Sequence, residues 1–118
     1  MVDMGADAVV CCHTHCPLPW EFYAGKPIVY GLGNLIFEPL QDVNASWHEG
    51  YLAKLSVAEN QVSFEPIPYL QSREKPGVRK MVDPARRPFI VEMEQRGAQL
   101  KDSAFLEYQW LNNCLHQK

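Results

Sequence analysis

The sequence predicts an α/β protein that contains one buried strand, two β-hairpins and a C-terminal helix. Three observations predict this class. Residues 8–12 form a continuous apolar run, which is typical of a strand covered on both faces. Two later stretches each carry a pair of apolar segments around a turn, the pattern of a hairpin. Near the C-terminus, apolar residues recur at helical spacing.

The composition indicates one small globular domain. The chain has 118 residues, of which 47% are hydrophobic and 21% charged, with a net charge of -3. This charge gives no sign of a nucleic-acid partner. No apolar stretch approaches the roughly 20 residues that span a bilayer, and no signal pattern opens the chain. We therefore expect a cytoplasmic chain without a membrane segment.

The first residues resemble the end of a helix that runs into the first strand. Gly5 is placed as a helix stop, and the apolar run of residues 8–12 follows closely. An independent domain rarely begins within such a helix-to-strand connection. We therefore expect the chain to be the C-terminal part of a larger protein.

The first hairpin is expected over residues 20–30. Residues 20–23 and 27–30 are the two strands, and residues 24–26 are the turn. Pro17 and Pro19 are expected to break regular structure before it. After it, residues 31–34 read as a flexible turn.

The second hairpin is expected over residues 51–66, with its turn at residues 59–61. Residues 71–88 are rich in proline and basic residues and read as a linker or surface loop. The predicted division is a domain portion at residues 1–70 and a linker with a helical extension at residues 71–118.

Two helical segments are expected in the extension. One face of the last helix is predicted from Ala104, Tyr108, Leu111 and Leu115. Asp102 or Ser103 suits its N-cap. Residues 89–100 are a weaker helical candidate, which Gly97 interrupts.

His13 and His15 are the leading functional candidates. In an extended backbone, residues two apart point to the same side, so both imidazoles can face one metal ion or two adjacent ions. The alternative is two polar residues in a turn. Their place at the carboxyl end of a strand favours function. Two histidines do not complete a catalytic site, which usually has three or more protein ligands.

The four cysteines leave two interpretations open. Cys11, Cys12 and Cys16 are too close in sequence to pair easily with one another, so free thiols are expected. A thiolate zinc site is the alternative, but the remaining Cys114 stands alone on the predicted helix. The default for Cys11 is a small buried hydrophobe.

Other polar residues are weaker candidates. Glu21 and Glu38 suit a base or a partner that holds a histidine in one tautomer, and a solvated carboxylate is the alternative. A basic cluster can steer an anionic substrate or simply be a solvated loop. It comprises Arg73, Lys75, Arg79, Lys80, Arg86 and Arg87.

Residues 5–38 resemble the C-terminal conserved block of the CapA family, the capsule-biosynthesis or poly-γ-glutamate synthesis proteins. The order is a Gly-Ala-Asp strand, the His-x-His, a Glu-aromatic hairpin with Gly-Lys-Pro-Ile, and a Gly-Leu-Gly-Asn turn. The family is similar in fold to calcineurin-like metallophosphatases, in which two β-sheets face each other between helices. The resemblance therefore implies the C-terminal portion of such a sandwich.

The resemblance also implies a site. His13 and His15 correspond to ligands of a divalent metal centre (Mn, Zn or Fe), dinuclear in the complete protein, and Gly33, Asn34 and Glu38 to residues that shape it. The implied activity of the complete protein is that of a metal-dependent hydrolase or polymer-processing enzyme. The implied substrate is an anionic polymer or phosphoester, and complete homologues can be membrane-anchored or exported.

The chain also departs from the family pattern. Cys11, Cys12, Leu35 and Glu38 replace residues that are more usual there. The family's Asp-x-His, Gly-Asp and Asn-His motifs are missing, so a missing N-terminal part and an inactive fragment are expected. The rival from another class is a non-enzymatic interaction module or a truncated remnant.

Overall fold

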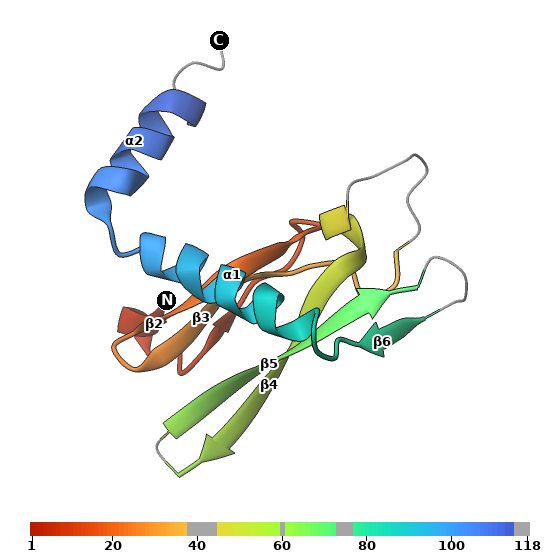
Figure 1. Ribbon diagram of the computed structural model, residues 1–118. Coiled ribbons are helices and arrows are strands. Elements are labelled where there is room, and N and C mark those ends of the chain that lie inside the picture. Colours follow the sequence, from red (N-terminus) through yellow and green to blue (C-terminus); the bar gives the residue numbers. More distant parts are fainter. Residues whose placement is uncertain (38–44, 60, 73–76, 115–118) are drawn as a thin grey trace.

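Two three-stranded sheets and two helices make up the computed structural model, which describes residues 1–37, 45–59, 61–72 and 77–114 (Figure 1). The predicted mixed α/β class is confirmed. The elements are the 3-10 turn η1 (Val2–Met4), β1 (Val9–Val10), β2 (Pro17–Tyr23), β3 (Lys26–Leu32), η2 (Ala45–His48), β4 (Glu49–Ala58), β5 (Gln61–Gln71), β6 (Val78–Lys80), α1 (Arg86–Gln99) and α2 (Ser103–Cys114).

The first sheet has the strand order β1-β3-β2, with β1 parallel and β2 antiparallel to the central β3. Ala24 and Gly25 connect β2 and β3 with φ angles of 50° and 76°. Two consecutive positive φ angles are those of a type I′ turn, whose twist suits a tight hairpin. The first predicted hairpin is confirmed, with both strands longer than expected.

Two expectations for the first sheet are wrong. β1 is not covered on both faces within the described residues, since Val10 is 42% exposed. Its place at the sheet edge leaves only β3 beside it. Pro17 and Pro19 do not break the structure but lie within β2. β2 is also an edge strand, where a missing backbone N–H removes no ladder hydrogen bond.

The second sheet has the order β4-β5-β6. β4 and β5 pair in antiparallel register from Glu49↔Leu70 to Ala58↔Gln61, which confirms the second hairpin. β6 pairs with β5, so the expectation of a loop over residues 71–88 is wrong for this strand.

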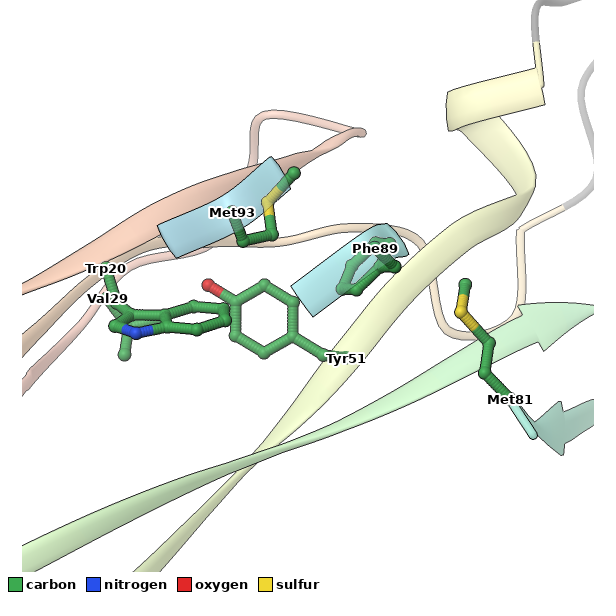
Figure 2. Packing of buried hydrophobic residues seen from close by; sticks show 6 residues of the cluster. All are labelled: Trp20, Val29, Tyr51, Met81, Phe89 and Met93. Carbon is green, nitrogen blue, oxygen red and sulfur yellow. The ribbon is translucent and has the colours of Figure 1, made fainter. Parts of the chain in front are cut away.

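α1 lies across the first sheet, where it packs on β2, and it also contacts β5 of the second sheet (Figure 1). Tyr51 is fully buried at the centre of the core, with its ring edge-on to Trp20 and Phe89 (Figure 2). The core residues are Trp20, Val29, Tyr51, Met81, Phe89 and Met93. These residues come from both sides of residue 70, the predicted domain boundary. The division itself stays a prediction.

The two sheets are joined by close backbone contacts. Gly33 forms a β-bridge with Gly50, and the Tyr51 hydroxyl donates to the carbonyl of Leu18 at 2.8 Å. A side chain at Gly33 would place its Cβ 2.5 Å from the carbonyl oxygen of Glu49. Glycine is therefore required where the chain crosses from one sheet to the other.

α2 confirms the predicted C-terminal helix and its cap. The Asp102 carboxylate accepts a hydrogen bond from the backbone N–H of Phe105 at 3.1 Å. The predicted apolar face is not buried within the described residues, because Tyr108 is 63% and Leu111 45% exposed. In Figure 1 the helix projects from the rest of the molecule. Among the described helices, none is long and apolar enough to cross a membrane.

Candidate functional site

The two histidines lie in the loop between β1 and β2. Both have left-handed backbones, with φ angles of 92° at His13 and 56° at His15. The expectation of an extended backbone is therefore wrong, because β1 ends at Val10 and the chain bends before β2. The bend still brings the imidazoles to the same region, with ring centroids 6.1 Å apart.

Contacts to β3 hold this loop. The backbone N–H of Cys11 donates to the carbonyl of Val29 on β3 at 2.8 Å. Within the loop itself, the Thr14 hydroxyl donates to the carbonyl of Cys16 at 2.8 Å. A Cβ at Gly31 would overlap the Thr14 hydroxyl oxygen. The small residue on β3 thus lets the histidine loop lie directly on the strand.

Asn34 connects the end of β3 to the loop. Its side chain is buried, with 5% exposure. Its Nδ2 donates to the carbonyl of His15 at 2.9 Å and to the carbonyl of Trp47 at 3.2 Å. Its Oδ1 lies 2.8 Å from Nδ1 of His15. One buried amide therefore contacts both the backbone and the ring of His15.

Two aromatic side chains enclose the His15 ring. Trp47 stacks on it with an interplanar angle of 8° and centroids 5.1 Å apart. Phe37 meets it edge-on at 4.8 Å and also contacts Trp47. The sequence analysis did not name Trp47 as part of the site. No local signal could have found it, because 32 residues separate it from His15 and only the fold brings the two rings together.

The other residues predicted to shape or support the site have different outcomes in the structure. Gly33 adopts a φ of 83° and makes the crossing that places Asn34 beside the histidine loop. Glu38 lies outside the described residues. Glu21 accepts a hydrogen bond from the Tyr30 hydroxyl at 2.5 Å, and no described contact joins it to a histidine. This hydrogen bond, with partial burial, raises the pKa of Tyr30 to about 12.

The cysteines do not form a zinc site with the histidines in the described part of the chain. Cys11 and Cys12 are exposed and Cys16 is half-buried, and all three are free thiols. The expectation that Cys11 is a buried hydrophobe is wrong because β1 lies at the sheet edge. The side chain of Cys114 lies outside the described residues.

The donor set fits part of a metal site. Neutral imidazole suits Zn and Fe, two of the expected metals. With metal–nitrogen bonds of about 2.1 Å, two ring centres on one tetrahedral ion lie roughly 5.3 Å apart. The observed 6.1 Å is longer, so the rings must approach slightly to share one ion, or each ring faces one of two adjacent ions. Over the described ranges, no group of three or more His, Cys, Asp or Glu could hold an ion. The histidines can contribute ligands, and completing the site requires others.

The basic residues of β6 and α1 are exposed. Arg79, Lys80, Arg86 and Arg87 are described, whereas Arg73 and Lys75 lie outside the described residues. Lys54 forms an ion pair with Glu65 at 2.9 Å and thereby lowers the pKa of the Glu65 carboxyl. Lys80 and Arg86 make smaller contributions in the same direction. Nothing in these contacts links the basic residues to the histidine loop.

Comparisons with known proteins support the resemblance for the first third of the chain. No curated protein matches the sequence. Residues 1–39 match the family model described as "Bacterial capsule synthesis protein PGA_cap". The matched stretch contains His13, His15 and Asn34, and this match supports a capsule-synthesis-related protein of the CapA type.

Proposed function

We propose that this capsule-synthesis-related chain contributes His13 and His15 to the divalent-metal centre of a metallophosphatase-like hydrolase. The observation that carries the proposal is the set of contacts that hold the His15 side chain. A buried amide contacts its ring and backbone, and an indole stacks on its face. Metal-binding histidines are commonly oriented by such a partner on the other ring nitrogen.

The backbone supports this interpretation over a plain polar turn. Two non-glycine residues in left-handed conformations within three positions are costly, at roughly 1–3 kcal/mol each. Such strain persists only where the surroundings enforce it, and it concentrates at functional sites. Burying Asn34 adds a desolvation cost that its hydrogen bonds to His15 and Trp47 must offset.

The remaining ligands come from outside the described residues. A catalytic metal usually has three or more protein ligands, and the described chain presents two close imidazoles. We infer that the two sheets form part of a larger metallophosphatase-like sandwich and that the chain is inactive without the rest of the centre. A bound divalent ion would supply polarisation of an ester or amide and a more acidic water. The substrate class we infer is an anionic polymer or a phosphoester.

Calorimetric titration of the purified full chain with Zn²⁺ or Mn²⁺ tests the proposal. We expect one weak saturable site, because two imidazoles bind an ion without completing its ligand set, and His13→Ala and His15→Ala should each abolish it. The matched control is the double variant Cys11→Ser/Cys12→Ser, which changes neighbouring exposed donors and keeps binding. Absence of saturable binding would leave a non-enzymatic module. Loss of binding only in the cysteine variant, or unfolding by a chelator, would indicate a thiolate or structural zinc site instead.

A further inference from the structure

We propose that Asn34 is a positioning residue that fixes His15 in the tautomer protonated at Nδ1 and leaves Nε2 as the free lone-pair donor. The tautomer follows from the hydrogen bonds of the chain itself. Its use, presenting Nε2 to a metal ion, rests on the proposed function.

The orientation of the Asn34 amide follows from its two backbone partners. The carbonyls of His15 and Trp47 can only accept hydrogen bonds, and they lie 2.9 Å and 3.2 Å from the same amide atom. That atom must be the nitrogen, because an oxygen there would face two other acceptors. Oδ1 is therefore the atom that faces the His15 ring.

The orientation of the amide decides the tautomer of His15. Oδ1 is an acceptor 2.8 Å from Nδ1 of His15, so only a protonated Nδ1 forms a hydrogen bond there. The opposite tautomer would place two lone pairs against each other beside a buried amide. We expect the Nδ1–H form to exceed the other by about 5- to 150-fold, which is the range that the penalty for an unsatisfied buried acceptor corresponds to.

Trp47 completes the same unit. Its indole stacks on the His15 ring, and its carbonyl accepts from Nδ2 of Asn34. Phe37 contacts the ring edge-on. Trp47 thus fixes the plane of the His15 ring while Asn34 fixes which ring nitrogen is protonated. Nε2 is the nitrogen left for a ligand. His13 is exposed, and its ring has no hydrogen bond to the described residues, which makes it an internal control.

The first test is the ring ¹⁵N spectrum of the full metal-free chain at about pH 8.5, where histidine is neutral. The His15 signals are assigned by their loss in His15→Gln. We expect the Nδ1–H pattern at His15. At His13 we expect the mixture of exchanging tautomers typical of a solvated ring. A dominant Nε2–H form at His15 would overturn the proposal without any variant.

Two variants test the cause. Asn34→Asp keeps an acceptor at Nδ1 and should keep Nδ1 protonated, although its second oxygen faces the carbonyls of His15 and Trp47 and should lower stability. Asn34→Ala removes the acceptor, so the His15 ring should then exchange between both tautomers. Its zinc affinity should be about 10–100-fold weaker. An unchanged tautomer in a folded Asn34→Ala chain would refute the assignment to Asn34. If that variant does not fold, the wild-type and Asn34→Asp spectra decide.

The tautomer and metal results fail independently. An Nδ1–H tautomer without zinc binding would refute the metal site and leave the role of Asn34 in fixing the ring intact. Zinc bound through both histidines with an Nε2–H tautomer in the metal-free chain would refute the positioning role and leave the proposed function standing.

Discussion

Gly97 should be indispensable for the packing of α1 on β2, and replacing it by alanine tests this directly. A Cβ at this buried position would come closer than 3.0 Å to the backbone carbonyl oxygen of Trp20, a distance that real Cβ atoms do not adopt. It would also contact Cβ of Pro19 at 3.8 Å. Both atoms belong to β2, so the strand cannot yield by a simple side-chain rotation.

Two effects of opposite sign compete in Gly97→Ala. Alanine stabilises a helix by about 1 kcal/mol relative to glycine. Relieving the overlap requires α1 to move away from β2, and overpacking of this kind costs about 1–3 kcal/mol. The movement also loosens Met93 and Phe89, which the core holds almost fully buried, and a gap of 0.5–1 Å forfeits about a quarter to a half of their dispersion contacts. The net result should be a fall in the free energy of unfolding by about 1–2 kcal/mol.

Thermal unfolding followed by circular dichroism measures this difference. For a chain of this size, we expect the midpoint of Gly97→Ala to fall by about 4–8 °C. The control is Gln95→Ala on the exposed side of the same helix, which should stay within about 0.5 kcal/mol of the wild type. A Gly97→Ala midpoint equal to or above that of the wild type would show that helix propensity decides and that α1 does not pack this closely.

Two further predictions concern charge and capping. The pKa of Tyr30 is raised from 10.0 to about 12, so its stabilising effect is complete below about pH 10 and lost as the pH rises through 12. Glu21→Gln should therefore flatten the loss of stability between these values in urea titrations, and an unchanged slope would contradict the Tyr30–Glu21 contact. Asp102→Ala should weaken α2 by about 1 kcal/mol and lower the helical signal, while Asp102→Ser preserves it. Because α2 buries little within the described chain, a matching fall in the midpoint of core unfolding would show that this helix is coupled to the core.

Sequence reasoning succeeded where local chemistry determines structure. Both hairpins follow from alternating apolar residues around short turns, and Ala24-Gly25 adopts the positive φ angles that such a turn demands. Asp102 caps α2 because its carboxylate reaches a backbone N–H three residues on. These features need no information from distant parts of the chain.

Sequence reasoning failed where the position of an element depends on residues distant in the chain. The apolar run that includes Val9 and Val10 looks like a central strand, but the sheet order places β1 at an edge. β6 is exposed along its whole length, so no apolar alternation marked it. Its pairing with β5 is a backbone interaction that side-chain patterns do not encode. Only the following residue, Met81, enters the core.

The histidine pair shows why a correct choice of residues can rest on incorrect geometry. The spacing of His13 and His15 was interpreted as that of an extended strand end, in which alternate side chains share a face. The structure reaches a similar ring proximity through two left-handed residues in a bend. A bend of this kind is not self-sustaining, because each such residue carries strain. The bend is held from outside the motif, by contact of Thr14 with Gly31 and by Asn34 on the carbonyl of His15. The glycine-rich end of β3 and the histidine motif are therefore one structural unit, although 17 residues lie between His13 and Gly31 along the chain. Most of these residues belong to the hairpin of β2 and β3. A substitution at Asn34 should consequently disturb the His15 backbone as well as its ring, whereas a substitution at exposed His13 should leave both in place.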